Sequence, residues 1–146
     1  NQDLTENLRL YINLDMNHVD IDYETRGNSV TLFTNDADDY KHIEALAEEY
    51  KKDNPLMAEK YRINLGLYDG PKGASNGMPC NSDHCPFVYD LDDGNTIGRA
   101  AVCYGSGSLE YHTYLDDTSR LNVESLGISA TVYGNYMKFL AYNPDK

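Results

Sequence analysis

The first segment of the chain alternates between apolar and polar side chains. Every second position is apolar, at Leu8, Leu10, Ile12 and Leu14. A period of two is typical of a β-strand that buries one face, so we predict a strand over residues 8–15. Asp15 would lie at the carboxyl end of this strand, where α/β sheets place ligand-binding groups. A turn at Gly27-Asn28 and a second strand over residues 29–34 follow.

Two later segments repeat with the period of an α-helix. Residues 35–53 form the first, with Asn35 or Asp36 as its cap and Pro55 preventing its continuation. Its apolar stripe comprises Ile43, Leu46, Ala47 and Tyr50. The second covers residues 122–142, and we expect its buried face to comprise Leu126, Ala130, Tyr133, Met137 and Leu140.

The remaining segments are shorter. Residues 61–67 and 100–104 read as strands, whereas residues 69–81 and 105–117 are rich in loop-forming residues. Because strands and helices interleave along the chain, the pattern predicts an α/β fold.

Length and charge narrow the class of protein. The chain has 146 residues, enough for a single domain over residues 1–146, and a formal charge of −12. This acidity argues against a nucleic-acid surface, which needs clustered Lys and Arg. No apolar run approaches the roughly 20 residues that a membrane span requires. Because the chain begins with Asn1, we expect a processed or excised product.

The three cysteines leave two alternatives open. Cys80 and Cys85 flank a short polar segment, so they are candidates for a local disulfide in an oxidising compartment and for free thiols elsewhere. Cys103 would remain unpaired in the first case. A second Cys pair with zinc-finger spacing does not occur in the sequence. The 13 tyrosines and the negative charge favour an extracellular or secreted protein.

Candidate chemistry lies in three polar clusters at strand ends or in loops. They are Asp15, Asp83-His84, and His112 with Asp116. Asp and His are suitable zinc ligands, and binding groups concentrate on loops above a rigid sheet. Each cluster alone is more typical of a capping or solvated residue, so only their convergence would make a site.

Three motifs carry a resemblance to a known family. Asn13-Leu14-Asp15-Met16 resembles the strand-end motif of the zinc aminopeptidase family, which includes leucyl-type aminopeptidases, glutamate carboxypeptidases, glutaminyl cyclases and the transferrin receptor. Residues 82–87, Ser-Asp-His-Cys-Pro-Phe, are similar to its Ser-Asp-His-x-Pro-Phe loop. Tyr111-His112-Thr113, followed by Asp116 and a long final helix, resembles its last motif. The motifs occur in the family's order and cover nearly the whole chain.

The resemblance implies a fold and a set of roles. The fold would be a partial mixed β-sheet flanked by helices, like the C-terminal half of a zinc-exopeptidase (phosphorylase/hydrolase-like) domain. Asp15 and His112 would each be a ligand of one of two zinc ions. Asp83 and His84 would line the substrate cleft, and Asp116 would orient a ligating imidazole. Cys80 and Cys85 would correspond to the local disulfide of some relatives.

In such a site two zinc ions polarise the scissile carbonyl and generate hydroxide from a shared water. A glutamate transfers the proton to the leaving amine of the peptide substrate. The family's remaining ligands and this glutamate precede the strand that bears Asp15, in a His-x-Asp motif, a bridging Asp and a Glu-Glu pair. Residues 1–14 contain none of these motifs. We therefore expect the chain to lack catalytic residues of its own and to be inactive without an upstream half.

Two similar sequences elsewhere in the chain do not replace them. His18-Val19-Asp20 has the His-x-Asp pattern but follows Asp15, and Glu48-Glu49 lies in a predicted amphipathic helix. Three readings result: a fragment of a zinc-dependent exopeptidase, a non-catalytic interaction module that associates with itself, and a glutaminyl-cyclase-like enzyme with one zinc. The expected partners are the N-terminal half or a second copy of the chain, because a partial sheet exposes an edge.

Overall fold

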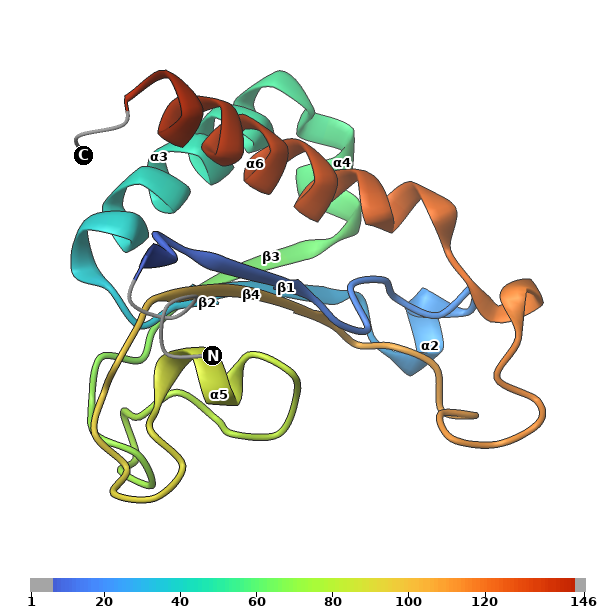
Figure 1. Cartoon of the computed structure of the whole chain (residues 1–146). Helices are drawn as coiled ribbons and strands as arrows, with labels where there is room; N and C mark the ends of the chain where they lie inside the picture. The colour runs from blue at the N-terminus through green and yellow to red at the C-terminus, as the bar shows by residue number, and fades with distance from the viewer. Residues whose placement is uncertain (1–6, 144–146) are drawn as a thin grey trace.

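The computed structural model describes residues 7–143 and contains a four-stranded mixed sheet (Figure 1). The strands are β1 (Tyr11–Leu14), β2 (Ser29–Thr34), β3 (Arg62–Leu67) and β4 (Ala100–Gly105), in the spatial order β1-β4-β2-β3. β1 is parallel to β4, β2 is parallel to β3, and the central pair of β2 and β4 is antiparallel. The expectation of an α/β fold with a mixed sheet is confirmed.

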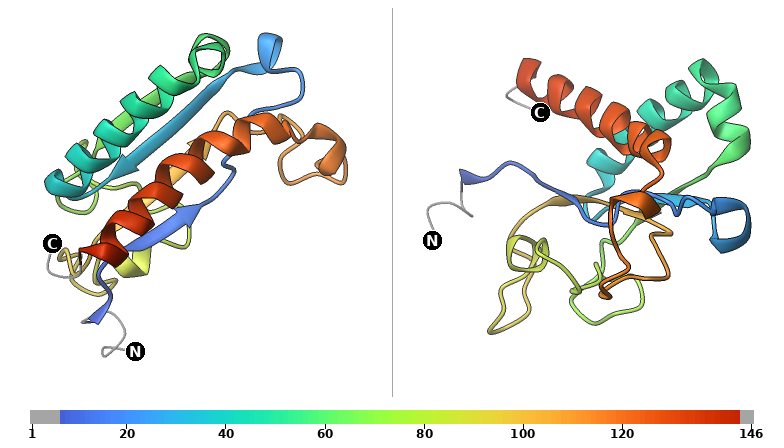
Figure 2. Two further views of the ribbon diagram at one scale, coloured as in Figure 1. Left: turned by 90° about the horizontal axis from the view of Figure 1, so that it is seen from above. Right: turned by 90° about the vertical axis from the view of Figure 1, so that its right-hand side faces the viewer.

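The two long helices cover one face of the sheet (Figures 1 and 2). They are α3 (Ala37–Asp53) and α6 (Val123–Tyr142), which pack against each other. The opposite face carries α5 (Cys85–Val88) and the long loops on either side of it. The short elements α2 (Tyr23–Arg26), α4 (Pro55–Lys60) and a 3₁₀ turn, η1 (Thr118–Arg120), lie in the connections.

Helix α3 forms as its sequence pattern predicts. The side chain of Asp36 caps it by accepting hydrogen bonds from the backbone N–H groups of Asp38 and Asp39. Ile43, Ala47 and Tyr50 are buried along one stripe. Pro55 ends the helix by starting the next one, since proline is well tolerated in a first helical turn.

The predicted face of α6 is wrong in part. Tyr133 is buried as expected, but Ala130 and Met137 face solvent, and the buried face instead comprises Ser125, Ile128, Ser129, Val132, Tyr133 and Tyr136. The apolar pattern left out Ser125 and Ser129, which are buried because their hydroxyl groups form hydrogen bonds within the fold. The hydroxyl of Ser125 donates to the carbonyl of Asn122 and accepts from the N–H of Val19. A buried hydroxyl satisfied in this way is tolerated inside a core.

Strand β1 is shorter than predicted and is covered on both faces. Leu10 and Ile12 pack against the core beneath the helices, as the alternation predicts. Tyr11 packs into a second apolar cluster on the other face, and Asn13 is buried. Leu14 is half exposed because the strand ends there. The alternation predicted that Tyr11 and Asn13 would face solvent. They are covered because the loops on either side of α5 lie over this face of the sheet, and local sequence does not predict where those loops lie.

The second cluster stabilises the loops that carry α5. It comprises Phe33, Met78, Val88, Tyr89, Ala100 and Val102. The Tyr89 hydroxyl donates to the carbonyl of Gly70 and accepts from the N–H of Met78 at 2.9 Å each. This hydroxyl therefore joins the two ends of residues 70–78 beneath the sheet. Within residues 7–143, none of the helices has the length and apolar character that a membrane span needs.

Candidate functional site

Asp15 directly follows β1, at the carboxyl end of the strand. The hydroxyl of Ser82 donates a 2.6 Å hydrogen bond to its Oδ2 atom. Met16, the next residue, has a φ of +47°, in the left-handed region that side chains with a Cβ rarely adopt. The chain thus turns sharply after Asp15, and the loop 82–84 holds its carboxylate.

A short hydrogen-bond network supports that loop from below. The Asn13 side-chain amide donates to Ser82 Oγ and to His84 Nδ1, at 3.2 Å each. His84 Nε2 lies 2.6 Å from the carbonyl oxygen of Pro79. Since an amide N–H can only donate, Nδ1 accepts and Nε2 carries the proton of a neutral ring. Burial lowers the pKa of His84, which favours this neutral form.

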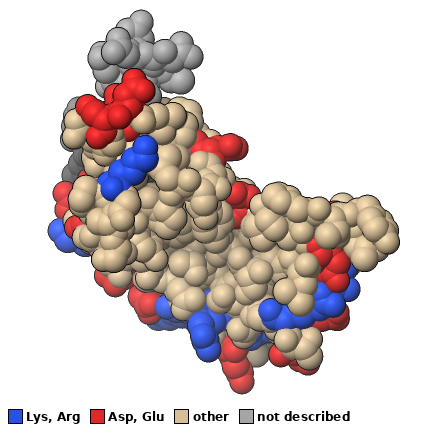
Figure 3. All heavy atoms as spheres, turned by 90° about the horizontal axis from the view of Figure 1, so that it is seen from below, with Lys and Arg blue, Asp and Glu red and all other residues tan. Residues whose placement is uncertain are grey.

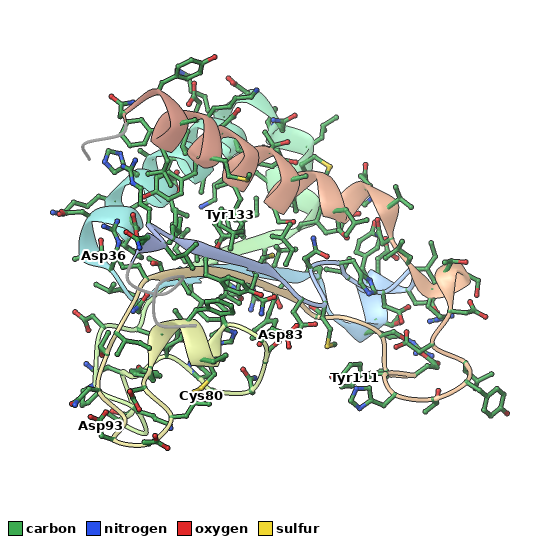
Figure 4. The ribbon with its side chains drawn as sticks, viewed as in Figure 1. Asp36, Cys80, Asp83, Asp93, Tyr111 and Tyr133 are labelled. Atoms are coloured by element: carbon green, nitrogen blue, oxygen red, sulfur yellow. A yellow bond between two sulfur atoms is a disulfide. The ribbon has the colours of Figure 1, made fainter. Side chains whose placement is uncertain are left out.

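This network places His84 inside the loop rather than on its surface. The side chain is fully buried, whereas Asp83 beside it is exposed. Figure 4 shows Asp83 below the carboxyl end of β1, on the side that faces Tyr111. The structure therefore gives His84 a supporting position, and the role of either residue in substrate binding stays a prediction.

Cys80 and Cys85 form a disulfide that encloses the same loop, with Cα atoms 4.9 Å apart. Cys103, in β4, is the free thiol and is buried. Burial raises the pKa of the Cys103 thiol to about 12, so it is protonated near neutral pH. The cysteines thus have structural positions, one pair closing the loop and one thiol filling the core.

The second loop, residues 106–121, carries His112. Its imidazole is exposed and stacks on the Tyr111 ring, with centroids 3.7 Å apart. His112 has a φ of +62°. Among the residues that the structure describes, Met16 and His112 are the two non-glycine residues with positive φ. Such conformations concentrate at functional sites. Here one falls on His112 and the other on the residue that follows Asp15, and His112 and Asp15 are the two zinc ligands that the sequence resemblance implies.

An ion-pair cluster holds the base of the second loop. Arg26 donates from Nη1 to both carboxylate oxygens of Glu110 at 2.9 Å, and Ser108 Oγ donates to the same carboxylate at 2.7 Å. The hydrogen bonds from Ser108 and Arg26 lower the pKa of Glu110 to about 2. Arg120 donates to the fully buried Asp20 at 2.5 Å.

The two sequences that resemble the upstream motifs, His18-Val19-Asp20 and Glu48-Glu49, have structural roles. Asp20 of His18-Val19-Asp20 belongs to this ion-pair cluster, and Glu48 pairs with Lys51 on the exposed side of α3. Neither motif contributes to the hollow described next.

Asp15 and the loop of His112 meet at one hollow of about 340 Å³. Its lining residues are Asp15, Met16, Asn81, Tyr104, Gly105 and Tyr111. Figure 3 shows this lower face of the molecule hollowed between the body and the projecting loop. Asp116 lines a different surface hollow, with His18 and Thr118. Of the predicted site residues, Asp15 therefore lines this hollow together with Tyr111, the neighbour of His112. His112 itself is not among the lining residues, and Asp116 lies apart.

The described residues alone do not complete a zinc site. They contain no group of three or more His, Cys, Asp or Glu side chains arranged to hold a metal ion, whereas a catalytic zinc usually has three protein ligands. Asp15 and His112 are of the right chemical type but too few in number.

Sequence reasoning missed the residues that support the site. These supporting residues are Asn13, Ser82, Arg26 and Glu110. Asn13 and Ser82 lie within the first two of the three quoted motifs, but the resemblance assigns neither of them a role. Asn13 bonds Ser82, 69 residues away, and Arg26 bonds Glu110, 84 residues away. Local periodicity cannot reveal these pairs, because it relates only residues a few positions apart.

No protein-family model matches the chain, and no curated protein or solved structure is significantly similar to it.

Proposed function

We propose that this chain is the C-terminal part of a zinc-dependent exopeptidase domain of the aminopeptidase type. In this proposal Asp15 and His112 each contribute one ligand to a two-zinc site, and Asp83 lies at the substrate cleft. The observation that carries it is the hollow shared by Asp15 and Tyr111, which are distant in sequence. The positive φ values of Met16 and His112 support it, because they turn the backbone at both ligand positions.

A second polypeptide segment supplies the missing ligands and the catalytic glutamate. Among residues 7–143, strand β1 is an edge of the sheet, and an edge strand can pair through the N–H and C=O groups along its outer side. A strand added there would run beside the one that leads to Asp15. An apolar hollow of about 460 Å³ lies along the same edge, lined by Leu8, Arg9, Leu10, Ile12, Met137, Leu140 and Ala141. We assign this edge to the companion half, because a strand added beside β1 would bring the loops that follow it close to Asp15.

Metal titration of the purified chain tests the ligand assignment. Zinc should bind weakly, because Asp15 and His112 each supply a single ligand to a different ion. Asp15→Asn and His112→Gln should each weaken zinc binding further. The matched variants Asp53→Asn and His42→Gln lie at exposed positions of α3 and should bind zinc like the parent chain. Two tightly bound zinc ions together with rapid aminopeptidase turnover would contradict the need for a companion.

The coding sequence upstream of Asn1 tests the companion itself. The proposal expects a His-x-Asp motif, a bridging Asp and a Glu-Glu pair there or in a co-purifying polypeptide. An upstream sequence and a native preparation that both lack these groups would instead favour a non-catalytic module.

A further inference from the structure

A cluster of exposed large apolar side chains lies on the loop that carries His112. Leu109 is 74% exposed, Tyr111 46%, Tyr114 92% and Leu115 52%. The four lie within seven residues, on a loop that projects beyond the sheet (Figures 1 and 3). Apolar surface gathered in this way usually marks an interaction site. We name Leu109, Tyr111, Tyr114 and Leu115 the apolar tip.

The apolar tip is held in shape by hydrogen bonds of its own loop. The N–H and the hydroxyl of Thr113 both donate to the carbonyl of Glu110, at 2.9 and 2.6 Å. The N–H of Leu115 donates to the Thr113 hydroxyl at 3.2 Å, and the N–H of Asp116 donates to the Thr113 carbonyl at the same distance. Consecutive turns thus hold the backbone that carries the apolar side chains.

The base of the loop is fixed to the body at both of its ends. Gly107 forms a β-bridge with Val19, and Leu121 forms one with Asp20. The Arg26–Glu110 pair connects α2 to the loop between Leu109 and Tyr111 of the tip. A loop with fixed ends and internal turns loses little conformational entropy when it binds, which makes it a suitable docking element.

Charge decides which partner fits the apolar tip. The loop, residues 106–121, contains Glu110, Asp116 and Asp117 and one cation, Arg120, which pairs with Asp20 and Asp22. Arg26 neutralises Glu110, whereas Asp116 and Asp117 are exposed beside Leu115. An anionic membrane surface would be repelled by these carboxylates. A second copy of the chain carries the same carboxylates and a formal charge of −12, which opposes self-association.

We propose that the apolar tip docks a polypeptide segment in which apolar side chains alternate with Lys or Arg. The two tyrosines and two leucines would bury the apolar side chains, since Tyr is enriched where binding energy concentrates. Asp116 and Asp117 would face the cations at the rim and increase the association rate. This interaction needs no metal, so it stands or falls separately from the zinc proposal.

Fluorescence anisotropy at physiological salt tests the proposal with short labelled peptides. The probe alternates Leu and Lys, one comparison peptide replaces every Lys by Glu, and another replaces every Leu by Ser. The full chain should bind the first at least about tenfold more tightly than either comparison, because each lacks one half of the recognition. Equal binding of the Leu-Lys and Ser-Lys peptides would overturn the docking role, since it would reduce the interaction to bulk charge.

Paired variants locate the interaction on the loop. Tyr114→Ser with Leu115→Ser should weaken binding of the Leu-Lys peptide by about tenfold or more. The matched control is Leu56→Ser with Tyr142→Ser, which removes one Leu and one Tyr exposed at 79% and 85% on other elements, and should leave binding unchanged. Circular dichroism should show that both double variants are folded, because all four substituted side chains are exposed.

Three other outcomes would assign the apolar tip elsewhere and overturn the proposal. The control pair could weaken peptide binding as much as the tip pair. Sedimentation velocity could show a dimer that the tip pair dissociates. Neutral phosphatidylcholine vesicles could bind the parent chain but not the tip pair, with peptide binding unchanged between them.

Discussion

The Ser82 hydroxyl donates a 2.6 Å hydrogen bond to Oδ2 of Asp15, joining the disulfide-closed loop to the end of β1. A hydrogen bond to a charged acceptor contributes more than one between neutral groups. We therefore expect Ser82→Ala to lower the free energy of unfolding by about 1–2 kcal/mol in urea titrations. The control Ser75→Ala, at an exposed position of the loop before the disulfide, should be nearly neutral. Equal effects of the two variants would remove the special role of the Ser82 hydroxyl.

Arg99 and Tyr136 enclose the buried carboxylate of Asp39. Arg99 donates from Nε to Asp39 Oδ2 at 2.8 Å and from Nη2 to Oδ1, and the Tyr136 hydroxyl donates to Oδ1. Asp39 is 1% exposed, so Arg99→Met would leave a buried charge without its cation. Because Arg99 is itself about a third exposed, we expect a loss of about 2–3 kcal/mol rather than the larger cost of a fully buried pair.

Two further variants separate charge from packing in this cluster. Lys41→Met removes an exposed partner of Asp38 and should change stability by less than about 0.5 kcal/mol. Adding Asp39→Asn to Arg99→Met should recover part of the lost stability, since an amide is cheaper to bury than an unpaired carboxylate. A double variant less stable than Arg99→Met alone would contradict this electrostatic account.

Glu110 should make the stability of the chain depend on pH in the acid range. Hydrogen bonds from Ser108 and Arg26 lower its folded pKa from an ordinary 4.5 to about 2. A depressed folded pKa stabilises the native state above the unfolded pKa, and this contribution disappears as the pH falls from about 4.5 through about 2. Urea midpoints measured across this window should fall more steeply for the parent chain than for Glu110→Gln. Parallel pH profiles would show that the carboxylate is not held in this way.

Reduction of the Cys80–Cys85 disulfide should destabilise the loop that holds Asp15. A cross-link over so few residues restricts the unfolded chain modestly, and we expect a loss of about 2 kcal/mol on reduction. Thermal unfolding with and without a phosphine reductant measures it. Cys80→Ala with Cys85→Ala should match the reduced parent and should not respond to the reductant, whereas a response would implicate Cys103.

Most of the elements of this fold follow from local sequence. The period of two before Asp15 and the period of 3.6 in residues 37–53 predicted β1 and α3, and the Asp36 cap was one of two candidates. Neighbouring residues determine these features, because periodicity and capping involve side chains within a few positions of each other. The face of α6 was misassigned because its buried serines are satisfied by Asn122 and Val19, and Val19 lies 106 residues away from Ser125.

The candidate site divides in the same way. Sequence by itself determined that Asp15 ends a strand and that His112 lies in a polar loop. Only the tertiary structure decided that Asp15 shares a hollow with Tyr111, that His84 is buried as a support, and that Asp116 lies apart. These outcomes depend on hydrogen bonds and ion pairs between segments distant in sequence, such as Ser82 with Asp15. Such contacts form when the packed sheet and helices bring those segments together, so no local pattern contains them.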